Sequence, residues 1–310
     1  MNNLVAIVGP TGVGKSRLAL RLAKSFNGEI VSADSRQVYR YMDIGTAKLN
    51  REDLSLVPHH LIDIINPDEQ FGLSQYQQLA YQNIEGIHRR GNPALLVGGT
   101  GQYVWSVLEG WKIPRVRPDL EFRRSLETKA AELGTDRIYQ ELVSVDPIAA
   151  QRIDPSNIRR VIRALEVRKS TMAPLSQLQT KTAPPFNIFI IGLTMKRAEL
   201  YHIVDQRVDD MVKRGLIEEL KDLIKMGYAF NLPAMSGIGY RQIGLFINGK
   251  MTLSQATERI KFETHRFIRH QYNWFRLKDD RIKWFNISEE VDSEIITLLY
   301  KFTGVRFSAS

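Results

Sequence analysis

The first hundred residues alternate short apolar runs with longer segments of helical pattern. The runs Leu4–Val8, Glu29–Ala33 and Ala94–Val97 predict buried strands, because each is a brief stretch of mainly apolar residues. Lys15–Phe26 and Ser74–Arg90 carry apolar side chains at helical spacing, and the second helix is expected to take its first residue as N-cap. The alternation predicts an α/β fold, with a parallel sheet flanked by helices and functional groups at the carboxyl ends of the strands.

The pattern changes between residues 113 and 185, where strand signals vanish. Helical segments rich in Arg, Glu and Leu take over there: Leu120–Leu133, Asp136–Leu142 and Asn157–Lys169. A Thr-Ala-Pro-Pro stretch closes this region, and Asn187–Leu193 resumes a strand. The chain is therefore expected to fold as an α/β core, residues 1–112 and 186–310, interrupted by a helical insertion at 113–185.

The remainder of the chain is mostly helical in pattern. Its last long helix is expected over Leu253–Leu277, preceded by a capping box between Thr252 and Gln255. Phe267 and Trp274 stand seven residues apart in it, which predicts an apolar stripe that faces the core. The arginines of the same helix are then left for the outer face.

The composition is that of a globular chain. Of its 310 residues 43% are hydrophobic and 25% charged, so a buried core is expected. Cysteine is absent, which excludes disulfides and thiolate chemistry. No apolar run approaches the roughly 18 residues needed to cross a bilayer, and no secretory signal is seen at the N-terminus. We therefore expect a cytoplasmic protein without membrane contact.

The net charge of +9 is concentrated in two segments. Residues 112–185 hold 14 Lys and Arg against 9 Asp and Glu, and residues 257–284 hold 8 against 4, while the rest is balanced. Two local basic segments on a neutral body indicate a polyanion partner. Solvated helix faces are the alternative, and charge alone does not decide between them.

A phosphate-binding loop follows the first strand. The eight residues from Gly9 to Ser16 match the pattern G-x-x-x-x-G-K-[ST] and lie between a strand and a helix, as that motif requires. Its backbone N–H groups and the helix N-terminus bind phosphate oxygens, Lys15 adds a charge, and Ser16 offers a hydroxyl to Mg²⁺. The residues expected to bind are Gly9, Thr11, Gly12, Val13, Gly14, Lys15 and Ser16.

The motif indicates a polyphosphate, but no particular nucleotide. No guanine-reading Asn-Lys-x-Asp is present, and the strand Ala94–Val97 ends in Gly-Gly-Thr instead of the aspartate that would support Mg²⁺. Asp63 is either a displaced version of that aspartate or, as we favour, a buried or turn-forming carboxylate of the core.

Seven further motifs resemble the tRNA dimethylallyltransferase (isopentenyltransferase) family. In chain order they are Ser32–Tyr39, Asp43–Lys48, His59–Asp63, Gly98–Tyr103, Arg159–Val167, Ile238–Gln242 and Arg269–Arg276. They keep their order across nearly the whole chain. The sequence departs from the family pattern at Gln102, a position often apolar, and at His270, where arginine is common.

The resemblance implies that the loop holds dimethylallyl diphosphate instead of a nucleotide, with Mg²⁺ as cofactor. The allyl group would pass to the N6 amine of the adenosine immediately 3′ of the anticodon of tRNA. Asp34, which directly follows the second strand, is the expected base. It could instead be a helix N-cap or support Mg²⁺ indirectly. Arg207 is expected to reach the same phosphates, unless it is a surface arginine paired with Asp210.

The third expected catalytic residue is Thr100, whose hydroxyl follows the third strand and would orient a substrate, unless it is only a structural turn residue. Residues of several segments are expected to contact the tRNA anticodon stem-loop, through base edges or through phosphates. They are Asp34, Ser35, Arg36, Gln37, Arg159, Arg160, Arg163, Tyr240, Arg241, Gln242 and Arg269.

Three other functions are considered. An adenylate isopentenyltransferase would use free AMP with the same chemistry, but it would need neither the helical insertion nor the basic C-terminal region. A P-loop kinase fits Lys15 and Ser16 but lacks the supporting aspartate. A nucleotide-gated RNA-binding module would bind RNA without prenyl transfer. No obligate protein partner is expected, and a monomer is the default.

Overall fold

The computed structural model describes residues 2–287 and 291–304. The chain forms two compact units, one made of Met1–Leu108 with Pro184–Ser310 and the other of Glu109–Ala183. The helical unit thus begins four residues before the expected 113 and ends two before the expected 185, because flanking residues pair with each other: Lys112 N donates to Thr180 O, and Thr182 N to Gly110 O.

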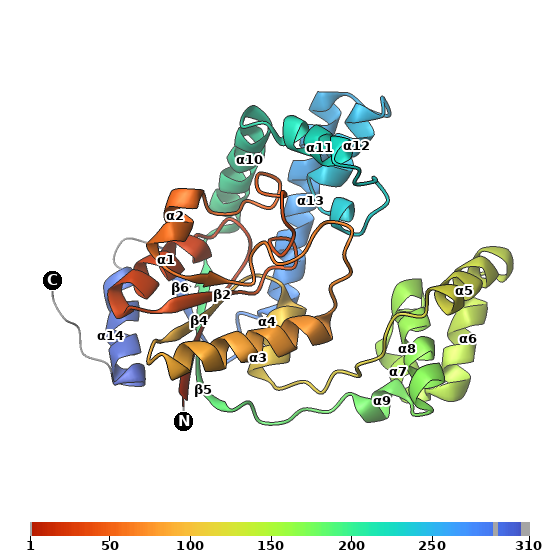
Figure 1. The fold of residues 1–310 in the computed structure, drawn as a ribbon, viewed down its shortest axis with the longest axis horizontal. Helices are drawn as coiled ribbons and strands as arrows, with labels where there is room; N and C mark the ends of the chain where they lie inside the picture. The colour runs from red at the N-terminus through yellow and green to blue at the C-terminus, as the bar shows by residue number, and fades with distance from the viewer. Residues whose placement is uncertain (1, 288–290, 305–310) are drawn as a thin grey trace. The chain divides into compact units, whose positions relative to one another are not determined.

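A six-stranded, wholly parallel sheet forms the centre of the first unit (Figure 1). Its order is β3-β2-β4-β1-β5-β6, with bounds Asn2–Val8 (β1), Glu29–Ser32 (β2), His59–His60 (β3), Ala94–Val97 (β4), Phe186–Thr194 (β5) and Ile282–Asn286 (β6). The expected parallel α/β fold is confirmed. Two edge strands escaped the sequence pattern, since β3 is two histidines long and β6 mixes Lys and Asn with apolar residues.

Helices cover both faces of this sheet, as the alternation of side chains along the strands requires. Val5 and Ile7 of β1 pack with α1 (Lys15–Phe26) and α14 (Val291–Thr303) in one core. On the other face lie α3 (Leu73–Arg89) and α4 (Gly101–Leu108), and the buried Tyr76 of α3 donates to Ser32 O at 3.1 Å. The expected N-cap at Ser74 is wrong. Gly72 caps α3, and its N–H donates to Gln75 Oε1.

The C-terminal helices build a second core in the same unit. They are α10 (Arg197–Lys213), α11 (Leu216–Lys225), α12 (Tyr240–Ile247) and α13 (Leu253–Trp274), with a short 3₁₀ helix, Ala234–Ser236, between α11 and α12. Apolar residues of α11–α13 pack with Val38, Tyr39 and Met42, which come from the loop after β2. This core therefore holds the loop after β2 in place. In chain order, a short helix, α2 (Arg51–Leu56), follows that loop and precedes β3.

Helix α13 begins where the sequence predicts, but the side chains that it buries differ from those predicted. Thr252 Oγ1 accepts from Gln255 N at 3.2 Å while Gln255 Oε1 accepts from Thr252 N at 2.8 Å, which confirms the capping box. The apolar stripe through Phe267 is wrong, because that side chain is 42% exposed. The buried positions are one residue further along: Ile268, Gln271 and, just after the helix, Phe275.

The second unit is a helical cluster with a core of its own. It consists of α5 (Leu120–Leu133), α6 (Thr135–Val145), α7 (Pro147–Arg152), α8 (Ile158–Thr171) and α9 (Leu175–Leu178). Glu166 of α8 is fully buried in it and binds Arg123 and Arg163. Burial would raise the pKa of Glu166, but the bonds from the two guanidinium groups outweigh it and leave that pKa below its usual value.

Across residues 2–287 and 291–304, no helix has both the length and the apolar character that crossing a membrane would take.

Candidate active site

The phosphate-binding loop is the turn from β1 into α1. Its three glycines, Gly9, Gly12 and Gly14, all have positive φ angles, which side chains other than glycine rarely adopt. Gly12 also lies against α10, since a Cβ there would be 2.4 Å from Val204 Cγ1. Val13 is buried, whereas the Ser16 side chain in the first turn of α1 is exposed. The loop thus keeps its backbone turned for an anion, with a hydroxyl beside it.

Lys15 lies folded over this loop. Its Nζ donates to Pro10 O at 2.7 Å. Burial lowers the pKa of Lys15 to about 8, Arg207 acts in the same direction, and the carboxylate of Asp34 opposes them. Because burial disfavours the charged ammonium when no anion is bound, Lys15 is suited to bind an anion.

Arg207 lies in α10, one turn beyond the Val204 that packs on Gly12. Its side chain is half-buried. Burial lowers the pKa of Arg207, and the charge of Asp34 partly offsets this. Arg207 is therefore no surface partner of Asp210, whose carboxylate lies 3.8 Å from Lys213 Nζ. The charges of Lys15, Asp34 and Arg207 therefore interact with one another.

Asp34 lies two residues beyond the end of β2 and forms a turn with the residues that follow it. Its Oδ1 accepts from Arg36 N at 2.8 Å and from Gln37 N at 3.4 Å. Residues 35–38 form a turn and no helix, so the expected alternative of a helix N-cap is wrong, and the contacts fix one carboxylate oxygen within the turn. The half-buried side chain keeps its second oxygen for another contact.

The ends of three neighbouring strands meet beside Asp34. Ala33 N donates to Val97 O at 2.7 Å, Gly98 N to Ile7 O at 3.2 Å, and Thr100 N to Ala33 O at 3.2 Å. Thr100 Oγ1 accepts from Ser35 N at 3.0 Å and lies 3.3 Å from Ser35 Oγ. The Thr100 hydroxyl therefore does hold a turn, and it stands at the same sheet edge as the phosphate-binding loop.

Gln271 is a site residue that the sequence reading missed. Its buried side chain reaches from α13 to two loops: Oε1 accepts from Thr11 N at 2.8 Å, and Nε2 donates to Gly99 O at 3.1 Å. The approach is close, since a Cβ on Gly99 would lie 2.3 Å from Nε2. The sequence signal that could have identified it is a single polar residue among the apolar positions that α13 buries.

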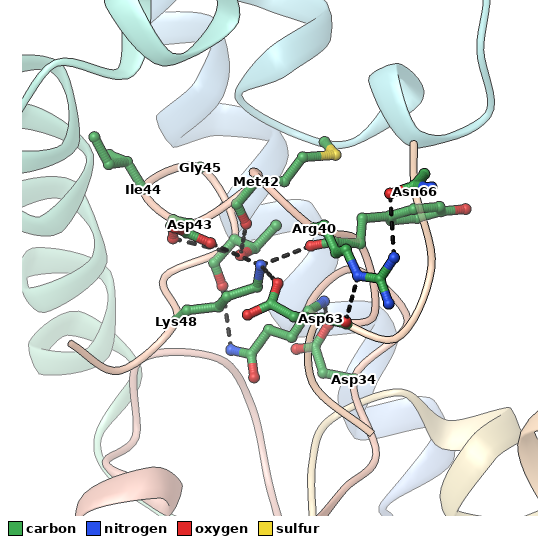
Figure 2. Close-up of polar contacts among 12 residues, drawn as sticks. Asp34, Arg40, Met42, Asp43, Ile44, Gly45, Lys48, Asp63 and Asn66 are labelled. Carbon is green, nitrogen blue, oxygen red and sulfur yellow. Dashed lines mark hydrogen bonds and ion pairs between the residues drawn. The ribbon is translucent and has the colours of Figure 1, made fainter. Parts of the chain in front are cut away.

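Arg36 and Gln37, expected to read bases, are both engaged by the protein. Arg36 Nη1 donates to Pro233 O at 3.0 Å, and Gln37 Nε2 donates to Thr46 O at 3.3 Å. Asp63 is not a displaced magnesium ligand but the turn-forming residue foreseen, with a φ of 55° and an ion pair to Lys48 (Figure 2).

Two expected tRNA contacts are corrected by burial. Tyr240 is 2% exposed, and its hydroxyl donates to Glu219 Oε1 at 2.6 Å. Gln242 is fully buried and caps its own helix, with Oε1 accepting from Gly239 N at 2.9 Å. Both side chains stabilise the C-terminal core and are out of reach of RNA.

The arginines divide into free and engaged side chains. Arg159 and Arg160 are exposed on α8, whereas Arg163, one turn later, binds Glu166 and Val116 O. Arg241 is exposed and paired with Glu263, and Arg269 is exposed and donates to Tyr201 Oη at 3.1 Å. On α8, therefore, Arg159 and Arg160 are accessible to RNA, whereas Arg163, one turn later, stabilises the helical unit.

The fold and the site together define a P-loop α/β protein with a cationic, glycine-lined phosphate cradle and a carboxylate at the adjoining strand end. The family model described as IPP transferase matches residues 37–278, and that described as isopentenyl transferase matches residues 2–63. The chain belongs to the tRNA dimethylallyltransferase (IPP transferase) family. Its sequence is 50% identical to the tRNA dimethylallyltransferase of Dehalococcoides mccartyi, over 96% of this chain and 92% of that one.

Further relatives and solved structures agree in their descriptions. The tRNA dimethylallyltransferase of Roseiflexus castenholzii is 52% identical over 88% of this chain and 89% of its own. The tRNA isopentenylpyrophosphate transferase of Bacillus halodurans has a TM-score of 0.73 and 40% identity, covering 98% of this chain and 97% of that one. A eukaryotic dimethylallyltransferase acting on tRNA has a TM-score of 0.81 and 26% identity, covering 100% of this chain and 82% of that one.

Proposed function

We propose that this enzyme transfers the dimethylallyl group of dimethylallyl diphosphate to the N6 amine of the adenosine immediately 3′ of the anticodon in tRNA. The family supports the reaction class. The observation that carries the proposal is that a glycine-lined loop with Lys15 folded over it lies against α10, the helix of Arg207, and beside the strand end that Asp34 follows. Cations and a carboxylate are what an anionic leaving group and a weak amine nucleophile require.

The diphosphate lies in the loop between Gly9 and Ser16. Backbone N–H groups, Lys15 and Arg207 stabilise the negative charge that grows on it as the allylic C–O bond breaks. Thr100 Oγ1 lies at the same edge and, held by Ser35, orients a substrate.

A magnesium ion fits this donor set. The exposed hydroxyl of Ser16 and phosphate oxygens of the substrate would hold it, since Mg²⁺ is usually bound by few protein oxygens together with phosphates and water. When bound there, the ion would supply positive charge to the leaving diphosphate. Removal of Mg²⁺ with a chelator should abolish transfer while the fold, followed by circular dichroism, stays unchanged.

Asp34 accepts the proton. The adenine amine is a weak nucleophile, because its lone pair is delocalised into the ring. As the new N–C bond forms, the diphosphate leaves with the electron pair of the C–O bond, and the proton of N6 passes to the free carboxylate oxygen of Asp34. The other oxygen stays bound to Arg36 N and Gln37 N, which holds the carboxylate in place.

The tRNA is held through its phosphates by exposed basic side chains of each unit. Arg159 and Arg160 serve in the helical unit, and Arg241 and Arg269 in the α/β unit. The reactive base must leave its stack to reach Asp34. A tRNA substrate favours action in the cytoplasm. The monomeric state stays a prediction, which sedimentation would test.

Transfer of label from dimethylallyl diphosphate, with Mg²⁺, to unmodified tRNA tests the proposal. AMP and ATP should be offered in parallel as acceptors. Label in tRNA alone, at the adenosine 3′ of the anticodon, is the expected result. Label in AMP would indicate an adenylate isopentenyltransferase, and hydrolysis of ATP without any transfer would indicate a kinase-like enzyme.

A further inference from the structure

Lys48 is a buried cation outside the phosphate cradle, with a side chain only 2% exposed. Its Nζ donates to three acceptors: Tyr39 O at 2.6 Å, Asp43 Oδ1 at 2.7 Å and Asp63 Oδ1 (Figure 2). An ammonium has three N–H donors, so all of them are used. The acceptors come from two separate segments, residues 39–43 and residue 63, which Lys48 thereby joins.

The two joined segments run alongside each other. Asp63 N donates to Gln37 O at 3.1 Å, Ile64 N to Val38 O at 2.9 Å, and Arg40 N to Ile65 O at 2.8 Å. The Arg40 side chain adds a bond from Nε to Asp63 O at 2.9 Å. Residues 37–40 and 63–65 are therefore held as a pair, with the Lys48 ammonium between them.

Backbone strain is concentrated in this region. Of the six non-glycine residues with positive φ within residues 2–287 and 291–304, four lie between positions 41 and 63: Tyr41, Ala47, Leu61 and Asp63. Such conformations persist only where surrounding contacts over-determine them, and they gather at functional sites. The same loop is also held by Glu219 of α11, which accepts from Asp43 N at 2.8 Å and Ile44 N at 2.7 Å.

The segment that contains Lys48 contacts Gln37, which in turn contacts Asp34. Gln37 donates from Nε2 to the carbonyl of Thr46 at 3.3 Å, two residues before Lys48, and its N–H faces Asp34 Oδ1. A small cavity of about 30 Å³ lies next to the phosphate-binding helix, and Ser16 and Gln37 line it with Leu49 and Ile62. The latter two are the chain neighbours of Lys48 and Asp63.

We propose that Lys48 is a positioning residue for the transfer reaction: by joining residues 39–43 to Asp63 it fixes the loop that places Gln37 and Asp34 beside the phosphate cradle. The inference rests on the proposed function. Lys48 touches neither substrate. It sets where the acceptor base meets Asp34, and it leaves the diphosphate site, built from another part of the chain, unchanged.

Two variants and a control test the proposal. Lys48→Met removes the charge and keeps an unbranched side chain that is one heavy atom shorter. Asp43→Leu removes one of the three acceptors at a side chain that is 64% exposed, so it is expected to fold in any case. Lys225→Met is the matched control, because it breaks an exposed pair with Asp222. For each variant, kcat with tRNA is measured beside the affinity and stoichiometry of inorganic diphosphate binding with Mg²⁺.

Misplacement of a reacting group by about 1 Å costs on the order of a hundredfold in rate. We expect Lys48→Met to lower kcat by about that factor, and Asp43→Leu by about tenfold, with full diphosphate stoichiometry and affinity within about threefold. Unchanged kcat in both variants, or a kcat that falls only in step with the fraction able to bind diphosphate, would overturn the proposal. An inactive parent enzyme would instead contradict the proposed function.

Discussion

Gln271 Oε1 accepts a hydrogen bond from Thr11 N at 2.8 Å, so a side chain of α13 holds the phosphate-binding loop. The two residues are 260 positions apart in the chain. The same amide also binds Gly99 O at 3.1 Å, next to Thr100. One glutamine therefore links the phosphate-binding loop to the loop that precedes Thr100.

Replacement of Gln271 by methionine should weaken use of dimethylallyl diphosphate. Methionine fills a similar volume but leaves the part-buried N–H of Thr11 and the buried carbonyl of Gly99 unpaired, which costs up to about 1–3 kcal/mol for each group. We expect kcat/KM for the diphosphate substrate to fall roughly 10- to 100-fold. Steady-state kinetics would show it, with the exposed Asn273→Met as control. An unchanged kcat/KM would mean that the loop keeps its geometry without this bond.

Replacement of Asp34 by asparagine should separate proton transfer from structure. Asparagine retains an Oδ1 that accepts from Arg36 N and Gln37 N, so the turn is preserved. It cannot take the amine proton, and kcat should fall by roughly 10²–10⁴-fold. Single-turnover transfer measures the step, and tRNA affinity should change little. A near-normal rate would remove Asp34 from the mechanism.

The pKa of about 8 at Lys15 predicts how activity depends on pH. Burial lowers this pKa, so the free enzyme loses the ammonium charge as the pH rises through about 8, well before an ordinary lysine would. In the proposed mechanism, diphosphate binding needs that charge. We expect log kcat/KM for dimethylallyl diphosphate to decline above pH 8 with a slope approaching about −1.

The control for this profile is Lys24→Met, at the far end of the same helix, which should keep the decline. A profile that stays flat up to about pH 10, near the ordinary lysine value, would show that Lys15 keeps its charge in the free enzyme.

The central strands, the phosphate-binding loop and Asp34 could be predicted from the sequence, because local pattern and strand order place them. Gln271 and Lys48 could not. Both lie in motifs that resemble the family, but Gln271 acts through Thr11 and Gly99, which only tertiary folding brings near, and the burial of Lys48 against Asp63 depends on how two loop segments pair. The same limit explains Tyr240 and Gln242: a motif marks a residue as special, but whether it faces RNA or the core depends on packing.

Arg159 and Arg163 should behave differently although both belong to one basic helix. Arg163→Met removes a partner of the buried Glu166 and should destabilise the helical unit by roughly 1–3 kcal/mol. Arg159→Met removes an exposed charge, and it should lower tRNA affinity and reduce the slope of log K against log salt by about 1. Thermal unfolding and salt-dependent binding measure the two effects. A salt-insensitive affinity in the unchanged enzyme would contradict phosphate contacts at this helix.

The acid stability of the α/β unit should depend on Glu29, which begins β2. The hydrogen bond from Arg90, aided by Asn92 and His60, lowers the pKa of this buried carboxyl to about 2. Because the folded pKa lies below the unfolded one, the stabilisation is fully present above about pH 4.5 and is lost as the pH falls through about 2. It amounts to about 3 kcal/mol. Urea unfolding between pH 2 and pH 6 should show this loss in the parent enzyme and a much flatter profile in Glu29→Gln. Equal pH dependence in both proteins would assign the acid sensitivity to other carboxylates.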